Sequence, residues 1–139
     1  MMPNIENNER LLLDHITYKM GNDIDRYDIV VFKPKFDKCC YIKRVIGLPG
    51  ETIRIEPTLY NLHGSVEKKY AIYINDKKLT DDTYHLENEL YNGTNGTITL
   101  AEDEYFVLGD NRNNSEDSRS DVVGKVNIST IEGVVVAKK

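Results

Sequence analysis

Short runs of β-branched and aromatic residues, separated by residues that favour turns, dominate the hydrophobic pattern of this chain. They lie at Tyr27 to Phe32, Tyr41 to Ile46, Thr52 to Glu56, Ala71 to Ile74, Thr97 to Leu100, Tyr105 to Leu108 and Gly133 to Ala137. Runs of this length and composition are typical of β-strands. Turn-forming residues follow many of them, as in Leu48-Pro49-Gly50 and Asn75-Asp76. The pattern therefore predicts a mainly β fold.

The remaining segments have weaker patterns. Arg10 to Met20 mixes apolar and polar residues without a helical stripe and suits a strand at least as well as a helix. A short helix is predicted near Asn127 to Ile131. Leu59 to Lys69 and Asp81 to Gly96 are polar and irregular, so we expect surface insertions there rather than separate domains.

Composition narrows the classes of function. A chain of 139 residues with 40% hydrophobic content fits one domain. Its apolar runs are far shorter than the roughly 20 residues that cross a bilayer. The net charge of −5 comes from scattered acidic and basic residues, which argues against nucleic acid as a partner. Cys39 and Cys40 are adjacent and provide no spaced zinc ligands, so we predict neither a metal site nor a cofactor.

Lys43 lies within an apolar strand segment, where neighbours such as Tyr41, Val45 and Ile46 can desolvate its ammonium group. A lysine with the ordinary pKa of ~10.4 is almost fully protonated at pH 7, whereas one with a pKa of ~7 to 8 has a substantial neutral fraction. Burial would therefore make Lys43 a base. The alternative is a lysine whose amine extends to solvent from an exposed strand position.

A second segment, Gly109 to Arg119, is too polar for a strand. It contains two serines and five charged residues, of which Asp110, Arg112, Asp117 and Arg119 form a set able to make bidentate ion pairs. Such pairs would hold a loop in one shape. A solvated loop is the alternative.

The two segments, YIKRVIGLPGE from Tyr41 and GDNRNNSEDSR from Gly109, resemble the lysine box and the C-terminal box of type I signal peptidases, peptidase family S26. Arg26 to Phe32 is similar to the family's R-G-D-[IV]-V-V-F strand, with Tyr27 in place of glycine. Glu9 to Leu12 is similar to the segment that follows the family's serine. The resemblance runs in family order along nearly the whole chain.

Met1-Met2-Pro3-Asn4 matches the last four positions of the family's S-M-x-P-T motif, with asparagine in place of threonine. The family's nucleophilic serine would therefore lie immediately before Met1. The chain has no serine before Lys43, the first being Ser65. We expect this sequence to be a fragment that lacks the serine and the N-terminal membrane anchor, and to be inactive as it stands.

The resemblance implies a role for each matched residue. Lys43 would be the general base for the missing serine, and Ser115 would orient its amine. Asp110, Arg112, Asp117 and Arg119 would support the site. The residues that would contact an extended substrate are Met1, Met2, Pro3, Tyr41 and Ile42.

The resemblance further implies a signal-peptidase-like, β-barrel-like fold of antiparallel sheets with few short helices. Residues 1–139 would form one catalytic-type domain on the extracytoplasmic face of the cell membrane, with a variable insertion at about 57–97. Signal peptides of exported preproteins would be its partners, together with the membrane surface reached through the anchor.

Two other functions remain open. A catalytically inactive signal peptidase-like protein that assists pilus assembly would bind pilin subunits, and the absence of a visible nucleophile leaves it possible. A self-cleaving repressor uses the same Ser/Lys chemistry on a related fold. The segment from Gly109 to Arg119 and the lack of a helical DNA-binding domain argue against the repressor.

Overall fold

A computed structural model describes residues 1–21, 23–82 and 96–138 of the chain. Its elements are β1 (Leu11–Asp14), a 3-10 helix η1 (Thr17–Met20), β2 (Ile29–Phe32), β3 (Tyr41–Gly47), β4 (Thr52–Leu62), β5 (Ser65–Ile74), β6 (Lys77–Lys78), β7 (Thr97–Thr99), β8 (Glu104–Leu108), β9 (Val126–Asn127), a 3-10 helix η2 (Ile128–Thr130) and β10 (Ile131–Lys138). All pairings are antiparallel. The prediction of a mainly β fold with few short helices is confirmed.

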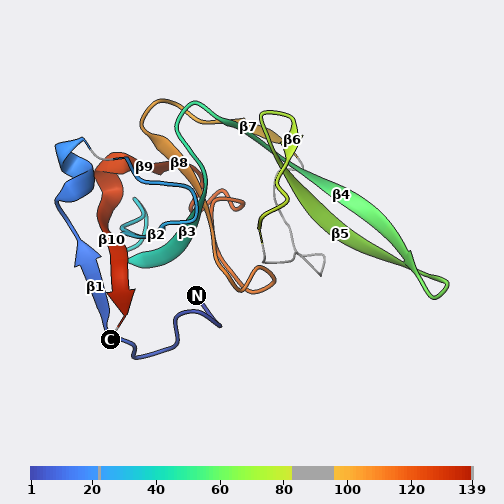
Figure 1. Cartoon of the computed structure of the whole chain (residues 1–139), viewed down its shortest axis with the longest axis horizontal. Coiled ribbons are helices and arrows are strands. Elements are labelled where there is room, and N and C mark those ends of the chain that lie inside the picture. Colours follow the sequence, from blue (N-terminus) through green and yellow to red (C-terminus); the bar gives the residue numbers. More distant parts are fainter. Residues whose placement is uncertain (22, 83–95, 139) are drawn as a thin grey trace.

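The strands form two sheets that lie side by side in Figure 1. One has six strands in the order β1-β10-β2-β3-β8-β9, and the other has four in the order β6-β5-β4-β7. In the six-stranded sheet β3 lies between β2 and β8, with Lys43 opposite Val30 on β2 and Arg44 opposite Leu108 on β8. The predicted lysine therefore lies on a central strand, one residue before the pairing of β3 with β8 begins.

Two hydrophobic clusters lie on opposite faces of β3 and β8, because successive side chains of a strand point to opposite sides. Val45 and Val107 belong to one cluster, which also contains Phe32 and Ile131. The neighbouring Ile46 and Phe106 belong to the other, with Ile53 and Leu108. These strands are buried on both faces, which explains their nearly continuous apolar sequence.

Strands β4 and β5 form a long hairpin that projects away from the six-stranded sheet (Figure 1). Its register runs without a shift from Ile53 opposite Ile74 to Leu62 opposite Ser65. The two turn residues, His63 and Gly64, both have positive φ, which suits the tight turns that join twisted antiparallel strands. The expectation that Leu59 to Lys69 is irregular was wrong, because backbone pairing across the hairpin overrides its polar composition.

Other weakly patterned segments fold as follows. Arg10 to Met20 divides into strand β1 and helix η1. The helix expected near Asn127 to Ile131 is η2, where the Asn127 side chain accepts a hydrogen bond from Ser129 N. The Asn75-Asp76 turn joins β5 to β6, with both residues at positive φ. Most of the expected insertion from Asp81 to Gly96 lies outside the described residues.

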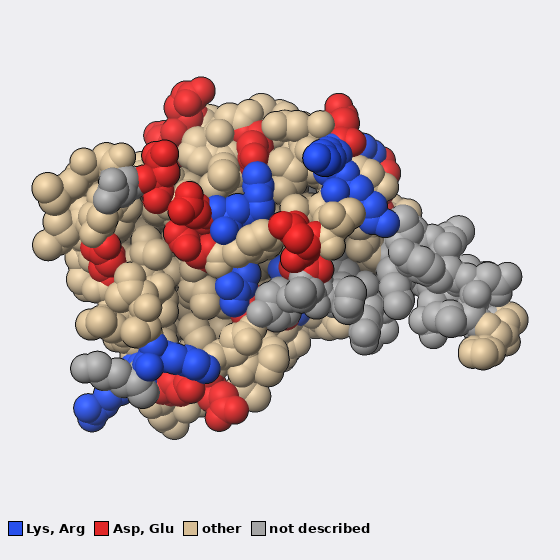
Figure 2. Space-filling model, in the orientation of Figure 1, with Lys and Arg blue, Asp and Glu red and all other residues tan. Residues whose placement is uncertain are grey.

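The described residues mix acidic and basic groups over the face shown in Figure 2, in agreement with their scattering along the sequence. Among these residues, no helix is both long and apolar enough to traverse a lipid bilayer.

Candidate active site

Lys43 occupies the first half of β3, at the rim of the hydrophobic cluster that contains Val45. Tyr41, Lys43 and Val45 share one face of the strand because side chains alternate. The Lys43 amine lies 5.8 Å from the centre of the Tyr41 ring. Burial is the largest cause that lowers the pKa of Lys43, and the charge of Arg119 lowers it further, although Asp117 and Asp110 oppose the shift. The pKa shift favours the neutral amine required of a base.

Gly109 separates the Lys43 amine from Ser115 at the end of β8. A Cβ atom added at Gly109 would lie 2.0 Å from Ser115 Oγ and 3.6 Å from Lys43 Nζ. A side chain at Gly109 would therefore displace Ser115, whereas the Lys43 amine would stay at an ordinary contact distance. Ser115 Oγ is buried and, among the described residues, has no hydrogen-bond partner. The structure brings Ser115 close to Lys43 without the hydrogen bond that the resemblance implies.

Asp117 and Arg119 form the buried centre of the loop from Gly109 to Arg119. Arg119 Nε donates to Asp117 Oδ1 at 2.8 Å, and its NH2 group donates to Asp117 Oδ2 at 2.9 Å and to the carbonyl oxygen of Arg112 at 2.7 Å. Asp117 also accepts a hydrogen bond from Gly109 N at 3.0 Å. The pair thus braces both ends of the loop, and it fixes Gly109 beneath Ser115.

The other two predicted support residues have partners outside this loop. Arg112 donates to both carboxylate oxygens of Asp82, at 2.6 and 3.1 Å, and its Nε donates to the carbonyl oxygen of Gly109 at 2.8 Å. Asp110 accepts two hydrogen bonds from Arg44, from Nε at 2.8 Å and from NH2 at 2.7 Å. Segments far apart in the sequence therefore hold the loop in place.

The N-terminal residues lie beside this site. Burial and the charge of Lys43 lower the pKa of the Met1 amino group, whereas the charge of Asp110 raises it. Met1 is half-buried, and Met2 and Pro3 are exposed. The Asn4 side chain donates to Asp110 Oδ2 at 2.8 Å.

The backbone edge of β3 next to Lys43 is open on one side. Strand β8 pairs with β3 only from Arg44 onward, whereas β2 pairs with the whole range from Tyr41 to Arg44. Tyr41 and Ile42 are half-buried. Among the described residues, the edge from Tyr41 to Lys43 that faces away from β2 has no strand partner. An extended peptide can pair with such an edge.

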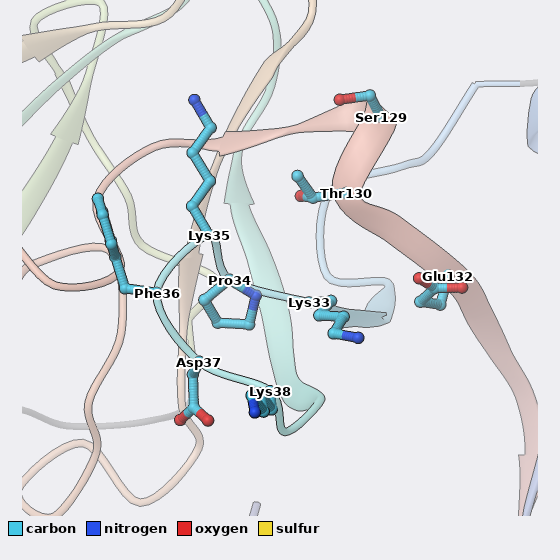
Figure 3. Close-up of a pocket in the computed structure, with 9 residues that line it drawn as sticks. All are labelled: Lys33, Pro34, Lys35, Phe36, Asp37, Lys38, Ser129, Thr130 and Glu132. Atoms are coloured by element: carbon cyan, nitrogen blue, oxygen red, sulfur yellow. The ribbon is translucent and has the colours of Figure 1, made fainter.

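A separate groove of about 560 Å³ lies at the turn that joins β2 to β3. Lys33, Lys35 and Lys38 contribute to its lining, but their side chains point in different directions (Figure 3). Phe36 beside them is exposed. The groove does not include Lys43, and the described residues contain no group of acidic, histidine or cysteine side chains that would hold a metal ion.

Sequence reasoning missed several contacts that shape the site. No role was predicted for Arg44, and Asp82 lay in an expected insertion. Tyr27, which replaces the family's glycine, adopts φ +76° and donates a hydrogen bond to Asp81, next to the partner of Arg112. The turn thus keeps a left-handed conformation that glycine adopts without strain. A run of two aspartates is too common in loops to have indicated these partners.

A family model described as signal peptidase, peptidase S26, matches residues 1–138. Signal peptidase I P of Bacillus subtilis subsp. natto is 37% identical over 96% of this chain and 69% of its own length. A probable signal peptidase I-2 of Synechocystis is 38% identical over 85% of this chain and 50% of its own length.

A solved structure gives the same result for the fold. The crystal structure of a signal peptidase I from Enterococcus faecalis V583 matches with a TM-score of 0.54 and 30% identity, over 81% of this chain and 97% of the other. The chain spans 60 and 61% of the length of two further Bacillus signal peptidases.

Proposed function

Because this chain belongs to the signal peptidase family, peptidase S26, we propose that it supplies the general base and the supporting loop of a serine endopeptidase that removes signal peptides from exported preproteins. The nucleophile in this proposal is a serine joined to the amino side of Met1, at the position that the S-M-x-P motif gives it. The proposal places the domain on the extracytoplasmic face of a membrane.

One observation carries the proposal: Lys43 Nζ and Ser115 Oγ both lie close to Gly109, and the Asn4 side chain ties the N-terminal segment to Asp110, the residue after Gly109. A residue joined to Met1 would therefore extend from a segment that is held next to the loop of a lysine whose pKa is lowered by burial. A base and a nucleophile must lie within hydrogen-bond reach for proton transfer. The tether from Asn4 to Asp110 supports a serine within this reach.

In the proposed reaction, the neutral Lys43 amine accepts the serine proton while the serine oxygen attacks the scissile carbonyl carbon. The resulting ammonium group returns the proton to the leaving amine, and an ester-linked acyl-enzyme remains. A water molecule, activated by the same amine, then hydrolyses the ester. Ser115 would orient the amine through a hydrogen bond formed during this cycle, since apo catalytic geometry is often looser than that of the complex.

The substrate in this proposal binds in an extended conformation along the open edge of β3. Backbone groups from Tyr41 to Lys43 would form the hydrogen bonds, with Met1, Met2 and Pro3 on the other side of the peptide. This arrangement would bring the scissile bond toward Lys43. Recognition through backbone groups suits signal peptides, whose sequences vary.

The test adds a serine before Met1. We expect the chain that begins at Met1 to leave a signal-peptide substrate uncut, and the serine-extended chain to cleave it in detergent or lipid. Lys43→Ala in the extended chain should abolish cleavage, because it removes the amine that is proposed to accept the serine proton. A matched control is Lys19→Ala, which changes an exposed lysine on η1.

Two outcomes contradict the proposal. Cleavage by the chain that begins at Met1 would show that its nucleophile is another residue. An extended chain that folds, binds the peptide and fails to cut it would instead favour the inactive signal peptidase-like protein that assists pilus assembly.

A further inference from the structure

Asp110 lies where three parts of the molecule meet. Its carboxylate is fully buried. Both of its oxygens accept hydrogen bonds from Arg44 on β3, and Oδ2 also accepts one from the Asn4 side-chain amide at 2.8 Å. One carboxylate therefore joins the N-terminal segment, strand β3 and the loop from Gly109 to Arg119.

Each of these three residues is close in sequence to a part of the proposed machinery. Arg44 follows Lys43, and Asp110 follows Gly109, over which Lys43 and Ser115 meet. Asn4 comes three residues after Met1, the residue that would adjoin the nucleophile. The carbonyl oxygen of Asn4 also accepts a hydrogen bond from Lys138 Nζ of β10 at 2.6 Å. Asn4 is thus held through both its side chain and its main chain.

We propose that Asn4 is a positioning residue that sets the distance between the N-terminal segment and Lys43 through its hydrogen bond to Asp110. The inference rests on the proposed function, because the distance matters for catalysis only if a nucleophile precedes Met1. Arg44 already supplies two hydrogen bonds to the buried carboxylate, so removal of the amide does not leave Asp110 unpaired. Removal of the Asn4 amide is therefore expected to shift the N-terminal segment and to leave the fold intact.

The first test measures steady-state kinetics in the serine-extended chain. Asn4→Ala should lower kcat by about tenfold to a hundredfold, since small misplacements of reacting groups have effects of this size. KM and the melting temperature should stay nearly unchanged. Asn4→Asp should lower kcat more, because a carboxylate would face Asp110, and Asn4→Thr, which keeps a donor, should retain more activity than Asn4→Ala.

Asn7→Ala is the matched control, because Asn7 lies in the same segment and its side chain is exposed. It should leave kcat unchanged. If Asn4→Ala and Asn4→Asp both keep the kcat of the parent, Asn4 has no positioning role. Equal losses in Asn4→Ala and Asn7→Ala would also overturn the inference.

A second test needs no activity and uses the chain that begins at Met1. The pKa of the Met1 amine is lowered by burial and by Lys43, so it reports how close the segment lies to the site. Asn4→Ala should raise this pKa toward its ordinary value, as measured by the pH dependence of N-terminal acylation, while Asn7→Ala should not. If the serine-extended chain is inactive but Asn4→Ala still raises the Met1 pKa, the proposed function is rejected, whereas the role of Asn4 in holding the N-terminal segment stands. An unchanged Met1 pKa together with an unchanged kcat would reject the Asn4 role.

Discussion

The loop from Gly109 to Arg119 and the hairpin of β4 and β5 are held in shape by different forces. Buried charged side chains hold the loop: Asp117 pairs with Arg119, Arg112 with Asp82, and Asp110 with Arg44. The hairpin depends on a continuous backbone ladder between neighbouring strands. Its ion pair between Arg54 and Glu56 is partly exposed.

The difference shows where sequence changes matter. A backbone ladder is available to almost any residue, so the hairpin tolerates variation beyond its base, where Ile53, Ile72 and Ile74 are buried in a hydrophobic cluster. The loop needs particular charged partners, because a buried charge that loses its partner is strongly unfavourable. The position of Ser115 beside Lys43 therefore depends on a few side chains that lie outside any strand.

The largest expected effect comes from Asp117→Ala. The substitution leaves the Arg119 guanidinium buried without its partner and removes the acceptor for Gly109 N. We expect the free energy of unfolding to fall by ~3 to 5 kcal/mol, as measured by urea denaturation. Glu56→Ala on the hairpin is the control and should change it by only ~0 to 1 kcal/mol. Equal effects of the two substitutions would contradict the comparison.

Gly109→Ala tests the steric part of the same loop. The added methyl group would overlap Ser115 Oγ and Cβ, so the serine side chain must move. We expect a loss of ~1 to 3 kcal/mol in the free energy of unfolding, together with loss of cleavage by the serine-extended chain. Gly64→Ala at the hairpin turn costs some stability because Gly64 has positive φ, but it should leave cleavage intact, because no atom within 4 Å meets the added carbon. Unimpaired cleavage by Gly109→Ala would show that Ser115 is not needed beside Lys43.

Lys43→Met should stabilise the fold while it removes the proposed base. The folded-state pKa of Lys43 lies below its ordinary value of 10.5, so folding disfavours the protonated amine. We expect a gain of ~0.5 to 2 kcal/mol at neutral pH, as for other substitutions at functional sites. The gain should shrink as pH rises toward 10.5, where the unfolded chain also loses its proton. Thermal melting as a function of pH measures this gain in stability. A gain that does not depend on pH would show that the lowered pKa of Lys43 is not its cause.

Shortening the hairpin should have the smallest effect. Replacement of residues 58–69 by Asn-Gly keeps Pro57 opposite Tyr70 and ends the strands in a turn that suits an antiparallel pair. We expect the free energy of unfolding to change by less than ~1 kcal/mol, because loop and hairpin length contribute weakly to stability. Cleavage by the serine-extended chain should be unchanged. Loss of folding on shortening would show that the hairpin supports the site.

The sequence by itself identified the strands that are buried on both faces, since apolar β-branched runs such as Ile29 to Phe32 and Tyr105 to Leu108 have few other stable arrangements. It also predicted the residues of the proposed site, because Lys43 and the charged loop from Gly109 fit motifs with fixed order. It failed for the hairpin from Leu59 to Lys69, where pairing between neighbouring strands outweighs polar composition.

The tertiary structure alone decided the partners of Asp110 and Arg112. Asp110 and Arg112 lie near each other in the sequence, yet their partners are Arg44 on β3 and Asp82 beyond β6. Composition shows how many charges a loop contains, but pairing depends on which side chains are buried together. That burial is set by the packing of strands far apart in the chain, and it places Asn4 against Asp110 and brings Ser115 and Lys43 to Gly109.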